Sequence, residues 1–153
     1  MTHLNIGDKA PAFLGLDQNS NQLSLSDYKG KKLILYFYPK DNTPGCTAES
    51  CNLTENYSEL HKKGFDVLGV SPDNVESHQK FISKFNLGFN LIADVDKKMC
   101  MNYGVFGPKK FMGREYEGVH RITFVINENQ IIEKIFKKVD TKNHAKQILE
   151  SYK

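Results

Sequence analysis

The sequence contains no apolar run that approaches the roughly 20 residues needed to cross a lipid bilayer. Residues 1–8 are polar and show no positively charged start followed by an apolar stretch, which argues against a secretory signal. We therefore expect a soluble protein of the cytoplasm that has no membrane partner.

A strong charge imbalance is also missing, because 21 Lys and Arg residues face 18 Asp and Glu residues and the formal net charge is +3. The lysines are spread along the chain, and short lysine groups such as Lys109-Lys110 are interpreted as solvated ends of elements. No basic arm stands out, so the composition makes no case for a nucleic-acid partner. Repeats, low-complexity tracts and linkers are absent as well, and we treat 1–153 as a single domain that can bury an α/β core.

Cysteine is scarce, and its count of three is odd. In a reducing compartment this argues against a static disulfide framework and favours catalytic or metal-bound cysteines. The spacing Cys-x-x-Cys, typical of a disulfide carrier or a zinc knuckle, does not occur. No phosphate or dinucleotide loop is found, and no ligand spacing links the histidines His3, His61, His78 and His144. We therefore expect neither a metal site nor a cofactor.

What the sequence does contain is an alternation of strand and helix patterns. Continuous apolar runs rich in β-formers predict buried strands over 33–38 and 65–70, and a third strand is predicted over 89–93. Helical spacing predicts helices over 44–63, which Gly64 ends, and over 74–85, 96–103 and 141–152. Hairpins are predicted over 12–25 and 121–136, the second around the polar run 127–130.

This order of elements predicts an α/β fold with a mixed central sheet, because strands alternate with helices before a hairpin and a closing helix. It matches a thioredoxin-like three-layer sandwich with an N-terminal β-hairpin. Since one fold hosts many chemistries, the architecture alone does not indicate a function.

The most informative segment is the loop and helix start that follow the strand over 33–38. In open α/β sheets, ligands tend to bind in the crevice at the carboxyl ends of the strands. Thr43 precedes a proline and is a good N-cap, and Pro44 suits the first helical position. Cys46 then falls in the first turn, where unpaired N–H groups and the helix dipole favour a thiolate, the nucleophilic form of cysteine.

The spacing between Cys46 and Cys51 allows a geometric argument. Five residues along an α-helix correspond to about 7.5 Å of rise and about 140° of rotation, which separates the two Cα atoms by about 8.7 Å. This distance exceeds the ~7 Å limit for a disulfide. A bond between the two cysteines therefore requires at least the first helical turn to unwind. The pair makes a poor structural disulfide but suits a switch between two local folds.

The same segment resembles the active site of the peroxiredoxin family, in which Pro, three residues, Thr or Ser, two residues and Cys follow one another. Pro39, Thr43 and Cys46 fit this pattern without a gap. The second cysteine five residues later resembles the bacterioferritin comigratory protein branch of that family. The likeness extends over nearly the whole chain, through the segments 69–73, 103–107, 111–114 and 118–124.

The resemblance implies an antioxidant thiol peroxidase in which Cys46 attacks a hydroperoxide and Cys51 converts the resulting sulfenic acid to a disulfide. It also implies that Thr43 hydrogen-bonds the peroxide, that Pro39 shields the pocket, and that Arg121 holds the thiolate and the substrate oxygen. A permanently cationic guanidinium with forked donors suits that role. The implied partners are a hydroperoxide and thioredoxin or a similar dithiol reductant, and the implied state is a monomer.

Two rival functions use the same cysteines. A thiol–disulfide oxidoreductase acting on proteins would want Cys-x-x-Cys, but Thr43 stands where its first cysteine would be if Cys46 were the second. A redox-sensing or chaperone-like protein would use the disulfide only to report an oxidant.

Several further residues have a structural interpretation beside a functional one. Cys100 is interpreted as a buried inert thiol, with a second resolving partner as the alternative. His120 could be a general base, although a packed or hydrogen-bonded histidine is more usual at a strand start. Glu49 either pairs with an active-site cation or lies on a solvated helix face. Phe106 and Phe111 indicate packing at a loop near the site.

Overall fold

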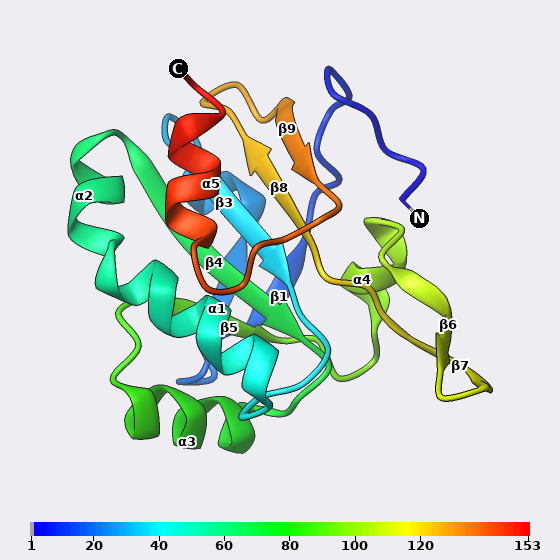
Figure 1. Ribbon diagram of the computed structural model, residues 1–153. Coiled ribbons are helices and arrows are strands. Elements are labelled where there is room, and N and C mark those ends of the chain that lie inside the picture. The colour runs from blue at the N-terminus through cyan, green and yellow to red at the C-terminus, as the bar shows by residue number, and fades with distance from the viewer. Residues whose placement is uncertain (1) are drawn as a thin grey trace.

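The computed structural model describes residues 2–153 and has a central sheet between two layers of helices and loops (Figure 1). The strands are β1 (Leu14–Leu16), β2 (Gln22–Ser24), β3 (Lys32–Phe37), β4 (Phe65–Ser71), β5 (Asn90–Ala93), β6 (Phe106–Phe111), β7 (Arg114–Val119), β8 (Ile122–Ile126) and β9 (Ile132–Phe136). The helices are α1 (Pro44–Glu55), α2 (Tyr57–Lys62), α3 (Val75–Phe85), α4 (Lys98–Asn102) and α5 (His144–Glu150), and a 3₁₀ turn, η1, covers Leu25–Tyr28.

The seven-stranded sheet has the order β2-β1-β5-β4-β3-β8-β9 and is mixed, as the sequence predicts. The strand pairs β3–β4 and β4–β5 are parallel, whereas β8 runs antiparallel to both β3 and β9. The N-terminal hairpin β1–β2 and the hairpin β8–β9 are both confirmed. This order places β8, from late in the chain, directly beside the early strand β3, and so sets the start of β8 near the loop that follows β3.

Strand β3 is buried on both faces, and its side chains alternate between two core layers. One layer contains Ile34, Tyr36 and Tyr38 and is covered by α1, α2, α3 and α5, which contribute Leu53, Leu60, Phe81 and Ile148. The other layer contains Leu33, Leu35 and Phe37 and is covered by η1, α4 and the N-terminal segment. The three-layer, thioredoxin-like sandwich is therefore confirmed.

The helix predicted over 44–63 is in fact two helices that meet at Asn56. The side-chain amide of Asn56 donates to the carbonyl of Asn52 at 2.9 Å, and the backbone of Asn56 leaves helical geometry at φ −103° and ψ 7°. Gly64 follows α2 with φ +88°, the left-handed conformation that a helix-ending glycine adopts readily. Helices α4 and α5 begin later and end earlier than predicted.

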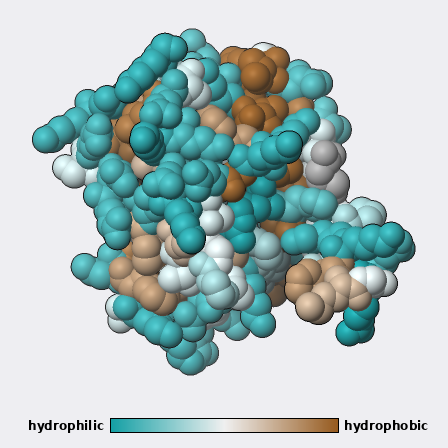
Figure 2. All heavy atoms as spheres, in the orientation of Figure 1, coloured by the Kyte–Doolittle hydropathy of each residue, from teal (hydrophilic) through white to brown (hydrophobic). Residues whose placement is uncertain are grey.

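The β6–β7 hairpin is missing from the predicted elements, and it projects from the body of the protein (Figure 2). Its two turn residues, Met112 and Gly113, have φ of +52° and +78°, as a tight hairpin turn demands, but Met-Gly is not the usual turn signal. Most of its residues are exposed, so no apolar alternation marks the strands. The packing predicted for Phe111 is wrong, because this side chain is 64% exposed. Phe106, in contrast, packs against the core.

Every helix within residues 2–153 falls short of the length and apolar character that crossing a membrane requires.

Candidate active site

Cys46 lies in the first turn of α1, just beyond the carboxyl end of β3, and is 1% exposed. The buried residues of α1 recur at the spacing of a single helical face, and they are Cys46, Glu49, Ser50 and Leu53. Packing of this face against the sheet buries the thiol at the helix start, where the helix dipole favours an anion.

Thr43 occupies the N-cap position of α1 with an extended backbone, and Pro44 follows in the first turn, both as predicted. The prediction that the Thr43 side chain caps the helix is wrong. Its hydroxyl instead donates to the carbonyl of Lys40 at 2.8 Å, which ties the loop to itself. Because a hydroxyl oxygen has two lone pairs, Oγ1 can still accept a hydrogen bond from another molecule.

Arg121 reaches the thiol from the short connection between β7 and β8. Its Nη2 donates to Sγ of Cys46 at 3.2 Å, and its Nη1 donates to Oε1 of Glu49 at 2.9 Å. Gly45 makes this approach possible, because a Cβ at that position would lie 3.1 Å from Nη2. Burial by itself would lower the pKa of Arg121, but the negative charges of Cys46 and Glu49 raise it, so the guanidinium stays cationic.

The structure distinguishes between the two interpretations of Glu49, which are a pair with an active-site cation and a solvated helix face. The Glu49 side chain is fully buried and pairs with the Arg121 guanidinium, so the alternative of a solvated helix face is wrong. Burial raises the pKa of Glu49 to about 7, against the opposing effect of Arg121. This carboxyl therefore changes its charge in the neutral range, one helical turn from the thiol.

Lys109, on β6, is a second cation near the thiol, although the sequence indicates only a solvated lysine group there. Its Nζ donates to the carbonyl of Val119 at 2.9 Å. Burial and then the positive charge of Arg121 lower the pKa of Lys109, while Cys46 acts in the opposite direction. No local pattern could have found this residue, because the hairpin that carries it was itself not predicted.

Cys51 lies on α1 as a half-buried free thiol, and Cys46 is free as well. Burial and, after it, the charge of Glu55 raise the pKa of the Cys51 thiol. The folded helix therefore keeps Cys51 protonated and separate from Cys46, as the spacing argument requires.

For both Cys100 and His120, the structure favours the structural interpretation over the functional one. Cys100 is fully buried in the core layer that contains Leu33, on the opposite face of the sheet from Cys46. Burial raises the pKa of Cys100, and Asp94 adds to the rise, so the reactive thiolate form is disfavoured at this position. His120 Nε2 lies 2.9 Å from the carbonyl of Pro108 and donates to it.

Pro39 lies two residues after the end of β3 and is half-buried in the loop that leads to α1. This position is compatible with shielding the thiol, but it contributes no polar contact to the site. Its role remains a prediction.

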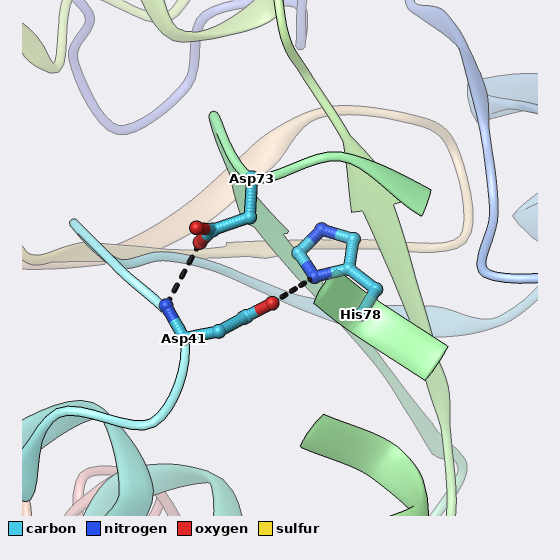
Figure 3. Close-up of side chains that lie close together, drawn as sticks. All are labelled: Asp41, Asp73 and His78. Atoms are coloured by element: carbon cyan, nitrogen blue, oxygen red, sulfur yellow. Dashed lines mark hydrogen bonds and ion pairs between the residues drawn. The ribbon is translucent and has the colours of Figure 1, made fainter. Parts of the chain in front are cut away.

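A polar cluster that the sequence does not predict lies behind the same loop (Figure 3). The backbone N–H of Asp41 donates to Oδ2 of Asp73 at 2.8 Å, and Oδ2 of Asp41 lies 2.7 Å from Nδ1 of His78. The other ring nitrogen of His78 lies 2.9 Å from the carbonyl of Ile92. Both ring nitrogens of His78 therefore lie within hydrogen-bond distance of an oxygen atom.

These three side chains offer potential metal-ligand atoms within 4.8 Å of one another. Their carboxylates, however, already accept hydrogen bonds from hydroxyl groups, which come from Tyr38, Ser71 and Ser77. Neighbouring side chains of the protein therefore already supply hydrogen bonds to these carboxylates. The same contacts tie the loop before α1 to β4 and α3. We therefore interpret the cluster as a clamp that holds the active-site loop in place.

The Glu49→Gln substitution is expected to change how stability depends on pH. The folded-state pKa of about 7 exceeds the ordinary value of 4.5, so Glu49 takes up a proton on folding between these values. Its contribution to the free energy of unfolding is present below the ordinary value and is lost as the pH rises through the folded-state value. Relative to the Glu49→Gln variant, the parental chain should lose on the order of 3 kcal/mol from about pH 4.5 to about pH 8.

Urea unfolding of both chains across this pH range measures that difference. Glu150→Gln, at an exposed glutamate, is the matched control and should follow the parental curve. A gap between the parental and Glu49→Gln curves that stays constant with pH would contradict the assignment.

Comparison with known proteins places this geometry in context. The AhpC/TSA family matches residues 6–135. Peroxiredoxin Bcp of Escherichia coli K12 is 44% identical over 149 residues, which cover 97% of this chain and 96% of that protein. A Haemophilus influenzae protein with the same bcp designation is 47% identical over 150 residues, covering 98% and 97% of the two chains.

Solved structures of other proteins are also similar to this chain over nearly its whole length. A crystal structure of a mutant of Xylella fastidiosa PrxQ has a TM-score of 0.92 at 33% identity and covers 99% of this chain and 97% of its own. Xanthomonas campestris bacterioferritin comigratory protein, studied for alkyl peroxide reduction, has a TM-score of 0.86 at 31% identity, with 99% and 96% covered.

Proposed function

This chain belongs to the AhpC/TSA family, in the Bcp branch of the peroxiredoxins, and we propose that Cys46 is the sulfur with which it reduces hydroperoxides. Its activity is that of a thiol peroxidase, an antioxidant oxidoreductase. One contact carries the assignment of Cys46, namely the 3.2 Å hydrogen bond from Arg121 Nη2 to its sulfur. A guanidinium only donates, so it favours the sulfur as an acceptor, which is the role of a thiolate.

In the first step the Cys46 thiolate attacks the terminal oxygen of the hydroperoxide. A sulfur–oxygen bond forms as the oxygen–oxygen bond breaks, so the sulfur is oxidised to sulfenic acid. The leaving oxygen takes up a proton and departs as an alcohol, or as water when the substrate is hydrogen peroxide. Arg121 stabilises the negative charge as it moves from sulfur to the leaving oxygen.

Thr43 and Pro39 complete the substrate pocket in this proposal. The Thr43 hydroxyl donates to Lys40, and its remaining lone pairs can accept the O–H of the hydroperoxide. Pro39, half-buried at the end of β3, limits the access of water to the sulfenic acid.

In the second step Cys51 condenses with the sulfenic acid and releases water, which leaves a disulfide. Since both cysteines lie on α1, the helix start must unwind first. This opening breaks the Arg121–Cys46 hydrogen bond, the 2.8 Å backbone bond from Thr47 to Thr43 and the backbone bonds within the first turn of α1. Helix ends open at low free energy, and unwinding removes Cys51 from the burial that keeps it protonated.

In the third step a dithiol reductant attacks the disulfide and returns both thiols by exchange. We propose thioredoxin or a similar protein for this role, with the enzyme acting as a cytoplasmic monomer. We also propose that alkyl hydroperoxides are substrates together with hydrogen peroxide. The alkyl peroxide reduction for which the Xanthomonas relative was studied supports this choice.

The Cys51→Ser substitution tests the proposed cycle. We expect it to retain the single-turnover oxidation of Cys46 within about twofold, because Cys51 is not part of the thiolate site. Donor-driven cycling should fall to background, since the sulfenic acid then has no resolving thiol. Mass spectrometry after one equivalent of peroxide should find a Cys46–Cys51 disulfide in the parental chain, and Cys100→Ser is the matched control. Cycling of Cys51→Ser at the parental rate would assign resolution to another group.

A further inference from the structure

One oxygen of the active-site carboxyl has no partner. Glu49 is fully buried, and while its Oε1 accepts from Arg121, its Oε2 has no hydrogen bond to any residue in the described part of the chain. A buried acceptor without a partner costs about 1–3 kcal/mol, so native structures contain few of them. This Oε2 faces Nε2 of His144, which is also fully buried, at 3.6 Å.

The contacts of His144 determine where its protons lie. The amide nitrogen of Gln147 donates to the carbonyl of Lys138 at 2.8 Å, so it is the amide oxygen that lies 2.9 Å from His144 Nδ1. Because that oxygen only accepts, Nδ1 carries a proton. On the other side, Nε2 lies 2.8 Å from the hydroxyl of Thr123, which can donate to it. The single lone pair on Nε2 of a neutral His144 therefore has two neighbours, the Thr123 hydroxyl at 2.8 Å and the unpartnered Oε2 of Glu49 at 3.6 Å, and a protonated Oε2 can share it with the hydroxyl.

We propose that His144 is a positioning residue that shares one proton with Glu49 and thereby sets how much of the Arg121 charge is available to Cys46. The inference rests on the proposed role of Cys46 as the reacting sulfur. With the proton between Oε2 and Nε2, Glu49 is neutral and Arg121 balances the thiolate alone. Without it, one guanidinium must balance both a carboxylate and a thiolate in a buried site, which disfavours the thiolate.

Besides His144 of α5, three titratable or charged groups lie around Glu49. Cys46 lies one turn earlier on α1, Arg121 reaches Glu49 from the connection between β7 and β8, and Tyr36 approaches from β3. Burial raises the pKa of Tyr36 well above its ordinary value, so this phenol stays neutral. Burial also raises the pKa of Glu49 itself to about 7, which places the shared proton on this carboxyl near neutral pH.

Around His144 the surroundings are mostly uncharged. Phe136 of β9 packs edge-on against the imidazole, and Gln147 of α5 accepts from it. The charges that act on it are Arg121 and Asp140, the latter in the loop before α5. Burial lowers the pKa of His144 to about 4, so it serves as the neutral acceptor of the pair. Because coupled sites titrate together, this pair and Cys46 should show one shared pH profile.

The experiment measures the single-turnover rate of Cys46 oxidation from about pH 5 to about pH 9. It uses the full chain with Cys51 and Cys100 replaced by serine, so that only Cys46 reacts, and follows the ultraviolet absorbance of the thiolate in parallel. The parental profile should rise as the thiolate forms and then fall severalfold as Glu49 loses its proton.

Two variants lock the pair in opposite states. His144→Gln offers a permanent N–H donor to Oε2 and keeps Glu49 ionised, so the falling limb should vanish and the maximal rate should drop about tenfold. Glu49→Gln is permanently neutral, so the falling limb should vanish and the profile should stay level once the thiolate has formed. His144→Asn, which retains a donor toward Gln147 but lacks the Nε2 acceptor that stabilises protonated Glu49, should move the falling limb to lower pH. His61→Gln, at an exposed histidine, is the control and should reproduce the parental profile.

A lower rate with an unchanged profile in both His144 variants would mean that the imidazole is only structural, and it would overturn the inference. A parental profile without a falling limb would also overturn it. If peroxide does not oxidise Cys46 in the parental chain, the proposed function and this inference fail together. Oxidation at Cys46 with superimposable profiles refutes the inference alone.

Discussion

Replacing Cys46 with serine is expected to abolish hydroperoxide consumption, with turnover falling by more than about a thousandfold, to the rate of the protein-free reaction. A serine hydroxyl stays protonated beside Arg121 and cannot be oxidised to a sulfenic acid. The substitution replaces the sulfur atom by oxygen and keeps nearly the same side-chain shape in the first turn of α1. Peroxide consumption coupled to a dithiol donor measures the effect.

Cys100→Ser is the control for this experiment, because it removes one thiol from the opposite core layer. It should turn over at a rate close to the parental one. If the Cys46→Ser chain consumed peroxide as fast as the parental chain, another group would perform the chemistry and the assignment of Cys46 would be wrong. Insulin reduction in the absence of any peroxide turnover would instead support a thiol–disulfide oxidoreductase.

Substitution of Arg121 is expected to cause the next largest loss of activity. Arg121→Met removes both the charge and the forked donors, and we expect the single-turnover oxidation rate to fall by about a hundredfold to a thousandfold. Arg121→Lys keeps the charge but not the fork that spans Cys46 and Glu49, so its loss should be smaller, on the order of tenfold. Stopped-flow oxidation of Cys46 at fixed pH provides both rates.

The control for Arg121 is Arg114→Met, at an exposed arginine of the β6–β7 hairpin, which should leave the rate unchanged. Since Arg121→Met also strips Glu49 of its counter-charge, urea unfolding of each variant should accompany the kinetics. A parental oxidation rate in a folded Arg121→Met chain would exclude the guanidinium from the reaction.

The pattern along the chain was a good guide to the buried elements. Strand β3 and strand β4 are continuous apolar runs, and both were predicted within one or two residues of their observed bounds. The β6–β7 hairpin was missed because its strands face solvent on nearly all sides, so burial leaves no periodic signal in its sequence. The break between α1 and α2 was missed for a different reason: the backbone of Asn56 leaves helical geometry where the sequence has neither proline nor glycine to signal it.

At the candidate site, local pattern and family resemblance contributed different parts. The helix start predicted a thiolate at Cys46 from local sequence alone, because capping and dipole effects act within one turn. Arg121 was expected only through the resemblance. Lys109 and the clamp formed by Asp41, Asp73 and His78 were not expected at all, since each depends on elements that pack together from separate parts of the chain.

The sequence by itself determined the alternating strands and helices, the place of Cys46 in a first helical turn, and the need for that turn to open before Cys51 can bond with it. All of these follow from spacing along a short stretch of backbone. Only the tertiary structure decided which charges surround the sulfur. Arg121 lies 75 positions from Cys46 and 72 from Glu49, and it meets them because β8 pairs with β3. Likewise, α5 packs on α1 and so brings His144 to the unpartnered oxygen of Glu49. Burial then shifts the pKa of each group, and burial is a property of the assembled core rather than of any local sequence.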